Sequence, residues 1–280
     1  MVQTRMRLTR MLNWNLSRGI KLRVGLCVAA LSGLCIAWGE PPFSDYMLQA
    51  VRAMPSGGGY ASDRAAEVRF AQKGAVWDAR RQRLTLSPRG ASPTFCSAAC
   101  YLTLLHALQL WEKDHPDLAF SPRVWESLRV ETQHPDGFLN WGRMNANGPG
   151  CAKWIHDLGA GINFTAVEAA RPGDLLKFFH TEHIGERERG HMVIFLGLVR
   201  AGEETCVRFW SSNSPQGYGV RQMPLSKMRH PIFTRITHPE RFAHAATLPQ
   251  YDTWLATMLT HSFRFAELVK KCAISAAPER

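Results

Sequence analysis

The first 39 residues contain no aspartate or glutamate, although the chain of 280 residues has 23 acidic residues further on. Six basic residues stand before position 24: Arg5, Arg7, Arg10, Arg18, Lys21 and Arg23. The uncharged, mostly apolar stretch Val24–Trp38 follows, and Ala37 and Gly39 are small residues near its end. Because a basic, an apolar and a small-residue segment in this order form a secretory signal, we expect residues 1–39 to be a signal peptide. The mature protein is then expected to be periplasmic or extracellular.

Val24–Trp38 falls short of the roughly 20 apolar residues that a transmembrane helix needs. A retained anchor at residues 1–39 is the alternative to a cleaved signal peptide. No stable membrane span is expected beyond this leader.

The chain also lacks a strong charge once the leader is removed. It has 34 basic and 23 acidic residues, a net charge of +11; without the six basic residues of the leader the balance is 28 − 23 = +5. Such a modest positive charge suits an anionic cell wall or envelope surface. No nucleic-acid-binding motif is present, so no nucleic-acid partner is expected.

No two cysteines have the spacing of a zinc site, and no internal repeat or low-complexity segment is visible. Five cysteines follow the leader: Cys96, Cys100, Cys151, Cys206 and Cys272. An odd number leaves at least one thiol unpaired in an oxidising compartment, and that thiol is a candidate reactive group. Cys96 and Cys100 lie four residues apart, a poor geometry for a disulfide, and we expect Cys100 to be a small core residue.

Two segments have the order and chemistry of a thiol nucleophile and its base. Cys96 begins a predicted helix that is apolar nearly all round as far as Trp111, and His191 begins an apolar predicted strand. The free N–H groups at a helix N-terminus lower the pKa of a thiol, and a neighbouring histidine takes its proton. His180 and His183 lie in a polar segment without an acidic cluster, so no metal site and no cofactor are expected.

The remaining pattern predicts an α+β chain. Residues 40–92 are expected to form an N-terminal extension packed on the core, with helices near Phe43–Met54 and 63–71 and a hairpin of 76–79 with 83–86. Residues 93–280 are expected to form the catalytic domain. It would contain a long polar loop at 136–150, a meander of strands at 175–179, 191–199 and 206–210, and a closing amphipathic helix over 251–268.

Three segments together resemble the NlpC-type and CHAP-type papain-like cell-wall hydrolases. "FCSAACYL" carries the Cys96-Ser97 pair, "RPGDLLKFF" matches the next strand, and "GHMVIFLG" carries His191. The resemblance covers roughly residues 93–213 and implies a papain-like fold, with a central helix that carries the cysteine and packs on a small antiparallel sheet. Phe95 stands where these families have aspartate, and Ala98 where they have glycine. Their tyrosine-glycine element lies close before the cysteine, whereas Tyr60 lies much farther upstream.

A triad needs a third group that orients the imidazole. Asn213, after the strand that follows His191, is the first choice, and its rivals are Ser211, Ser212 and Gln216. Asn213 could instead only build a turn, Cys96 could be a structural cysteine or half a disulfide, and His191 could be a satisfied strand-end residue. The Cys96 backbone N–H is one expected oxyanion donor, and the second is not identified. Substrate contacts are assigned to Trp141, Asn147 and Trp210, and Asn145 is a further candidate for the cleft wall.

The resulting hypothesis is an exported cysteine peptidase or amidase that cleaves an amide bond in peptidoglycan peptides. Cys96 attacks, His191 acts as base and then acid, and Asn213 orients the ring. A non-catalytic cell-wall-binding protein of the same fold is one alternative. A thiol acyltransferase that uses the same residues is another, and a wide apolar groove beside Cys96 would favour it.

Overall fold

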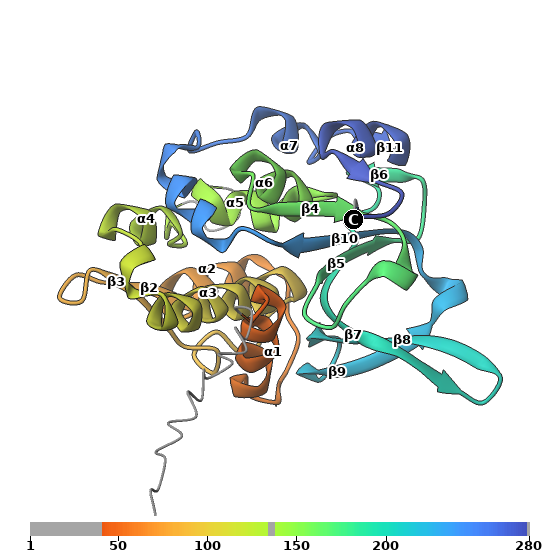
Figure 1. Ribbon diagram of the computed structural model, residues 1–280. Coiled ribbons are helices and arrows are strands. Elements are labelled where there is room, and N and C mark those ends of the chain that lie inside the picture. The colour runs from red at the N-terminus through yellow and green to blue at the C-terminus, as the bar shows by residue number, and fades with distance from the viewer. Residues whose placement is uncertain (1–40, 134–137, 279–280) are drawn as a thin grey trace, which may run out of the picture. The chain divides into compact units, whose positions relative to one another are not determined.

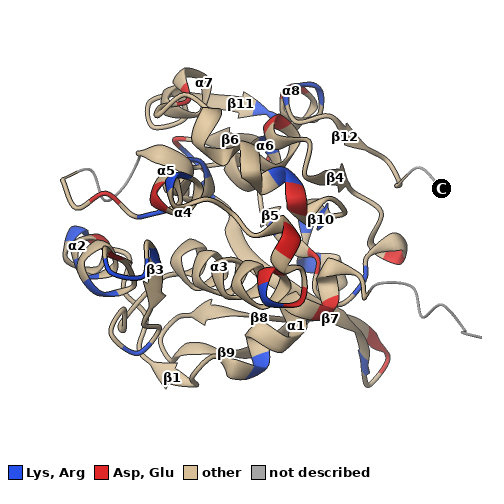
Figure 2. Ribbon diagram, turned by 60° about the vertical axis from the view of Figure 1, so that its left-hand side comes forward, with Lys and Arg blue, Asp and Glu red and all other residues tan. Residues whose placement is uncertain are grey.

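Helix α3 (Cys96–Asp114) is the most deeply buried helix of the computed structural model, which describes residues 41–133 and 138–278. Thirteen of its 19 residues are buried. Its only Lys, Arg, Asp and Glu residues are Glu112, Lys113 and Asp114 at the C-terminal end, so α3 is tan along most of its length in Figure 2. A helix that is apolar all round belongs inside a fold, and α3 is confirmed as the central helix.

The segment before α3 adds to the same core. It forms α1 (Phe43–Ala53), β1 (Gly57–Gly58), α2 (Arg64–Lys73) and the hairpin of β2 (Ala75–Asp78) with β3 (Arg83–Leu86). The two helices and the hairpin agree with the sequence predictions. Tyr46, Phe70 and Leu84 from these elements are buried in one cluster with α3. The predicted signal peptide, residues 1–39, lies outside the described residues.

One sheet of eight strands lies against α3, in the order β1-β9-β8-β7-β5-β10-β4-β12 (Figure 1). Its strands besides β1 are β4 (Gly161–Phe164), β5 (Leu175–Phe179), β7 (His191–Ala201), β8 (Glu204–Asn213), β9 (Gly217–Pro224), β10 (Arg229–Ile236) and β12 (Ile274–Ser275). The predicted meander β5-β7-β8 forms its centre.

The α+β class agrees with the prediction, but the small antiparallel sheet that was expected is not what the structure has. The sheet is large and mixed, because β12 pairs with β4 in parallel. Strands as short as β4 and β12 show no alternation that could reveal them in a sequence.

The two faces of the sheet bury different side chains. Leu175 belongs to the main cluster with α3, whereas its neighbour Leu176 belongs to a second cluster with Phe178, Phe195 and Phe233. Successive side chains of a strand alternate between faces, so Lys177 faces the same side as Leu175. A charged residue thus points from β5 toward the helical layer.

Two other segments also differ from the predictions. The polar tract 136–150, expected as a loop, contains α5 (Leu139–Asn145), which packs against α6 (Gly150–Leu158). Its glycine and asparagine content suggested a loop, but Asn140, Trp141 and Met144 are buried and hold the helix in place. The short helix α4 (Pro122–Ser127) precedes it.

The expected closing helix is broken into three elements. These are α7 (Thr253–Thr257), β11 (Ser262–Arg264) and α8 (Phe265–Lys271). β11 pairs with β6 (His183–Gly185), a short strand inside the segment that was expected to be a polar excursion. The backbone pairing with β6 outweighs the helical spacing of the apolar residues.

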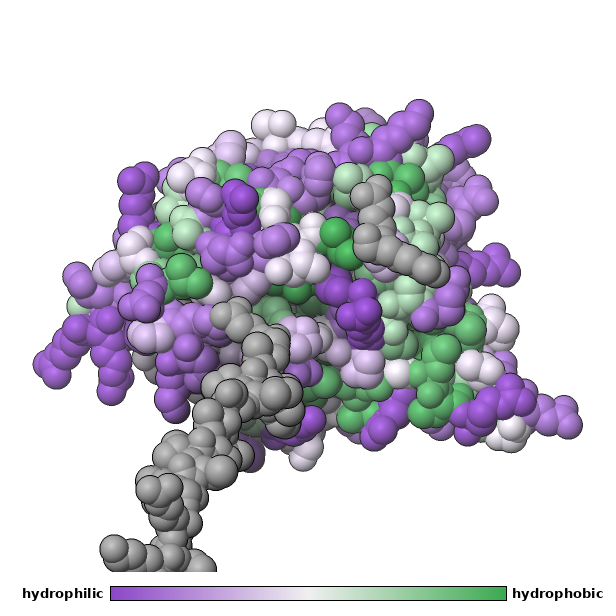
Figure 3. All heavy atoms as spheres, in the orientation of Figure 1, coloured by the Kyte–Doolittle hydropathy of each residue, from purple (hydrophilic) through white to green (hydrophobic). Residues whose placement is uncertain are grey.

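Hydrophilic side chains cover most of the face drawn in Figure 3, and the hydrophobic areas on it are small and separate. Within 41–133 and 138–278, no helix combines the length and the apolar character needed to cross a membrane.

Candidate active site

Cys96 is the first residue of α3 and is half-buried. The preceding residue, Phe95, is extended and buried, and its ring packs on Phe70 and Trp141 with centroids 6.2 and 6.1 Å apart. This aromatic anchor fixes the start of the helix without a capping side chain. The first N–H groups of a helix have no partner within it, so the Cys96 N–H is suited to bind an oxyanion.

His191 begins β7 and forms a hydrogen bond with the Cys96 side chain. Its ring stands edge-on to Phe178 and Phe209, with centroids 5.6 and 6.0 Å away. The two aromatic rings restrict the imidazole to one orientation, as a general base requires.

Asn213 lies at the end of β8 and its Oδ1 is 3.3 Å from His191 Nε2. The amide nitrogen of Asn213 donates to the carbonyl oxygens of Ser211 and Gly219, both at 3.0 Å. Because both N–H groups are used in this way, Oδ1 faces the ring and accepts from Nε2–H. The ring nitrogen that remains for the thiol is Nδ1.

The three rivals of Asn213 have other partners. The Ser211 hydroxyl donates to Met192 O at 2.7 Å, and the Ser212 hydroxyl donates to Thr94 O at 2.9 Å. Gln216 accepts a hydrogen bond from Arg221 on the surface. None of the three contacts the His191 ring among the described residues, so Asn213 is the residue that the structure brings to it.

The two reacting groups shift each other's pKa. Burial raises the pKa of the Cys96 thiol, but the charge of His191 and the hydrogen bond with it act in the opposite direction. Lys177 and the Met192 backbone N–H also lower it, and the resulting pKa is about 6 instead of 9.0. Burial lowers the pKa of His191, but the charge of Cys96 and the hydrogen bonds with Cys96 and Asn213 raise it overall. A thiolate–imidazolium pair is thus favoured near neutral pH.

Cys96 opens into a cleft of about 520 Å³. Its wall combines polar and charged residues with apolar ones: Tyr60, Ser62, Glu67, Phe95, Ser97, Phe138, Asn145, Ala146, Asn147, Lys177, Arg189, Gly190, Tyr251 and Leu259. The Ser97 hydroxyl donates to Asn145 Oδ1 at 2.7 Å, which ties the second residue of α3 to the end of α5. The cleft is large enough for a peptide side chain and the adjoining amide.

Tyr60 reaches this cleft although it lies 36 residues before Cys96 in the chain. Strand β1 pairs with β9 at Gly57–Tyr218 and Gly58–Gly217, and Tyr60 then bridges to Thr94 just before α3. Gly58 has a φ of +89°, and a Cβ there would lie 2.5 Å from Ser92 Oγ and 3.0 Å from Ser92 Cβ, so glycine is favoured at this close passage. Folding thus brings the Gly57–Tyr60 segment to Cys96, although the two are far apart in the sequence.

Lys177 was not predicted as a site residue. It is only 8% exposed, it lines the Cys96 cleft, and its charge acts on both Cys96 and His191. A Cβ at Gly190 would lie 2.9 Å from Lys177 Cε, so the stem of Lys177 passes directly beside the glycine before His191. The sequence feature that could have indicated a role for Lys177 is its charge within an otherwise apolar strand.

Two predicted substrate contacts are wrong. Trp141 is fully buried and packs against Phe70 and Tyr101, and Trp210 is 4% exposed and stacks on Tyr218. Both rings complete the core, where large aromatic surfaces gain most from burial. Asn147 does line the cleft, as does Asn145, and Asn147 Nδ2 donates to Met258 O at 3.3 Å.

The other thiols of the described chain do not have this chemistry. Cys100, Cys151, Cys206 and Cys272 are buried and unpaired, and no disulfide links Cys96. Burial raises the pKa of Cys100, and it raises the pKa of Cys151 to about 12. Cys100 is confirmed as a core residue, and the described residues contain no group of His, Cys, Asp and Glu that could hold a metal ion.

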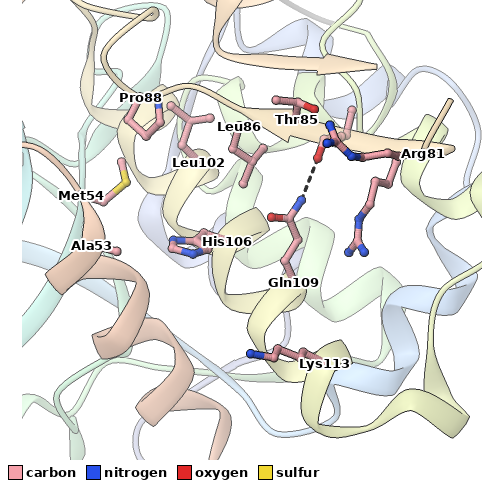
Figure 4. Close-up of a pocket in the computed structure, with 12 residues that line it drawn as sticks. Ala53, Met54, Arg81, Thr85, Leu86, Pro88, Leu102, His106, Gln109 and Lys113 are labelled. Atoms are coloured by element: carbon pink, nitrogen blue, oxygen red, sulfur yellow. Dashed lines mark hydrogen bonds between the residues drawn. The ribbon is translucent and has the colours of Figure 1, made fainter. Parts of the chain in front are cut away.

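A second hollow of about 520 Å³ lies between α1, β3 and α3 (Figure 4). His106, Gln109 and Lys113 of α3 face Met54 and Leu86 across it, and Gln109 Nε2 donates to Leu84 O at 2.8 Å. Burial lowers the pKa of His106. No cysteine lines this hollow and no nucleophile contacts His106 there, so the Cys96 cleft is the better candidate site.

Comparison of the chain with protein family models, with curated proteins and with solved structures finds no match in any of the three. The resemblance to the NlpC-type and CHAP-type hydrolases therefore stays a prediction that depends on its three motifs.

Proposed function

We propose that this protein is an exported cysteine hydrolase of papain-like fold that cleaves amide bonds in peptidoglycan peptides. The observation that carries the proposal is the contact of Cys96, at the start of α3, with His191, whose other nitrogen bonds to Asn213. Nucleophile, base and orienting amide form one connected chain, and its nucleophile lies in the wall of an open cleft.

The proposed reaction begins with transfer of the Cys96 proton to His191 Nδ1. The thiolate attacks the carbonyl carbon of the scissile amide, and the Cys96 backbone N–H stabilises the oxyanion. Tyr60 is the second donor in this scheme, because it lies on the cleft wall close enough to Cys96 for that charge, together with burial, to raise the pKa of its hydroxyl.

The tetrahedral intermediate then collapses. The C–N bond breaks as His191 gives its proton to the leaving amine, and a thioester to Cys96 forms. His191 next takes a proton from water, the hydroxide attacks the thioester, and the thiol is released. The pKa of about 6 for Cys96 provides a nucleophile at neutral pH without a cofactor.

The lining of the cleft is mixed and suits a substrate with both polar and apolar groups, such as a peptide. Polar residues around Cys96 are Ser62, Asn145, Asn147, Lys177 and Arg189, and apolar ones are Phe95, Phe138, Ala146 and Leu259. A wide apolar groove that would favour an acyltransferase would not have two cations in its wall. Contact between Cys96 and His191 also supports catalysis over a purely wall-binding role, for which no such pair is needed.

Digestion of purified muropeptides, followed by mass spectrometry, tests the proposal. The wild-type chain should release products that carry a new amine and a new carboxylate, and Cys96→Ala should release none. Cys206→Ala, which removes a buried thiol of β8, serves as the matched control and should retain activity. Equal digestion by wild-type and Cys96→Ala would overturn the assignment, and transfer of an acyl group without hydrolysis would favour the acyltransferase.

A further inference from the structure

Lys177 is a buried cation without a partner in the described structure. Its side chain is 8% exposed, and it forms no hydrogen bond or ion pair with another described residue. Burial of an unpaired charge is costly, and lysine is rarely buried without a partner. Burial lowers the pKa of Lys177, and the charge of Cys96 acts in the opposite direction. A negatively charged group bound in the cleft would stabilise the cationic form of Lys177 further.

The acidic residues around the cleft are engaged elsewhere. Glu188 interacts with Lys177 only at longer range, and its carboxylate accepts hydrogen bonds from the backbone N–H of Gly190 at 3.1 Å and of His180 at 3.4 Å. Glu67 lines the cleft but lies 3.4 Å from Arg64. The remaining negative charge near Lys177 is the thiolate of Cys96 itself.

The place of Lys177 in the sheet brings it next to both reacting groups. It pairs with Met192 across β5 and β7, and the Met192 backbone N–H bonds to Cys96. Its stem passes beside Gly190, the residue before His191. A ligand that contacts Lys177 would therefore lie immediately beside Cys96 Sγ.

We propose that Lys177 forms an anion subsite that binds a carboxylate of the substrate next to the scissile amide. The proposal rests on the proposed function for the identity of the substrate, a peptide with a free carboxylate. Arg189, on the rim of the same cleft, adds positive charge that attracts such a peptide. Lys177 then selects the anionic substrate and holds its amide against the thiolate.

A simpler role for Lys177 would be to stabilise the thiolate, since its charge lowers the pKa of Cys96. The two roles differ in one measurable property. A thiolate stabiliser changes the reactivity of Cys96 toward all electrophiles alike, whereas an anion subsite favours charged electrophiles over neutral ones of the same size.

Iodoacetate and iodoacetamide provide this comparison. In both reactions the Cys96 thiolate forms an S–C bond and iodide leaves; the reagents differ only in a carboxylate and a carboxamide. The ratio of their second-order rate constants at one pH cancels the thiolate fraction. Lys177→Met should lower the iodoacetate-to-iodoacetamide ratio by about tenfold, the effect of one charge-assisted hydrogen bond.

The control variants test whether the effect on the ratio needs the buried charge of Lys177 or any positive charge of the protein. Lys177→Arg keeps the cation and should retain most of the wild-type ratio. Arg187→Met removes an exposed charge that does not line the cleft and should change the ratio by less than about twofold, because water screens that charge. Lys177→Gln repeats the test should the methionine variant unfold. An unchanged ratio in Lys177→Met and Lys177→Gln, or equal loss of both rates in them, would overturn the subsite.

Muropeptides with free carboxylates and the same peptides with those groups amidated give a second measurement. The wild type should prefer the free carboxylates, and Lys177→Met should lose that preference. If no muropeptide is cut while the alkylation ratio still depends on Lys177, the proposed function fails and the anion subsite stands. If muropeptides are cut without regard to charge, the subsite fails and the hydrolase assignment stands.

Discussion

A single amide orientation decides which nitrogen of the His191 ring faces the thiol. Asn213 donates to two backbone carbonyl oxygens, which leaves its oxygen for His191 Nε2 and assigns Nδ1 to Cys96. The tautomer of the base thus follows from hydrogen bonds of a neighbouring strand. Such an indirect arrangement explains why an uncharged residue can serve as the third group.

Asn213→Ala should lower kcat by about 10- to 100-fold, a part of the 10²–10⁴ that general acid–base catalysis contributes. The ring loses its orientation while Cys96 and His191 remain. Asn163→Ala is the matched control, because Asn163 is also buried and donates to two carbonyl oxygens, at 2.9 Å each, far along the sheet in β4. Steady-state kinetics of both variants test this. Equal losses of activity would mean that Asn213 is only structural.

Alkylation should report the shifted pKa of Cys96 directly. Because only the thiolate reacts, the rate with iodoacetamide should rise with pH through a midpoint of about 6 instead of 9.0. His191→Ala should move that midpoint upward, since the charge and hydrogen bond that lower the pKa are lost. His106→Ala removes a histidine of α3 that lines the other hollow and should leave the midpoint unchanged. Peptide mapping should find the label on Cys96, and a label on buried Cys100 would mean that the wrong thiol was chosen.

The residues that could be predicted from the sequence are those with a motif around them. Cys96, His191 and Asn213 were predicted from their flanks and order, and the structure brings these three side chains together. Lys177 could not be predicted, because a lone lysine in a strand has no spacing that distinguishes a cleft from solvent. Trp141 and Trp210 were misplaced, since an aromatic ring fits a core and a cleft equally well until its neighbours are known.

At the scale of elements, the short strand β1 connects distant parts of the chain. It places Tyr60 beside Cys96, and the glycine at its end allows the backbone to pass close to Ser92. Asp174 has a comparable role next to β5, where its carboxylate accepts from Arg235 at 2.7 and 2.9 Å and from the Arg171 backbone N–H at 2.8 Å. The turn before the Lys177 strand is thereby tied to β10.

Gly58→Ala should displace Tyr60 and lower activity. Its φ is +89° and a Cβ would lie 2.5 Å from Ser92 Oγ, whereas Gly202, at φ +64°, has nothing within 4 Å. Both alanines incur the roughly 1–2 kcal/mol of the left-handed region, but only Gly58→Ala adds a clash of about 1–3 kcal/mol. Thermal unfolding should show the larger loss for Gly58→Ala, and kinetics should show lost activity in that variant alone. Similar behaviour of the two variants would mean that the close passage is not needed.

The prediction of helices and strands succeeded where an apolar pattern continues over many residues. It failed where pairing with a distant segment determines the structure. Helix α3 and the meander β5-β7-β8 have continuous apolar runs, and both were predicted. The split of the 251–268 segment into α7, β11 and α8 depends on pairing between β11 and β6, about 80 residues apart in the chain, which no local pattern reveals.

On the scale of the whole molecule, residues from Pro41 onward form one compact unit. Its main core includes Tyr46 and Phe70 from the segment before α3 as well as Trp154 and Phe242 from the segments after it. The Cys96 cleft draws its wall from the same distant segments, from Tyr60 to Leu259. The candidate site therefore depends on the complete fold from α1 onward.

Export should remove the leader without loss to this unit. The first described helix begins at Phe43, so cleavage after Gly39 leaves every described element intact. We expect the mature protein to begin at or near Glu40, outside the cytoplasm, because the basic and apolar segments end in the small residues Ala37 and Gly39. N-terminal sequencing of the native protein tests this directly. Residues 1–20 found on protein from the membrane fraction would support a retained anchor. A chain of residues 40–280 should unfold at the same temperature as the full chain, because the described helices, strands and buried clusters all lie from Phe43 onward, and a lower unfolding temperature would contradict the boundary.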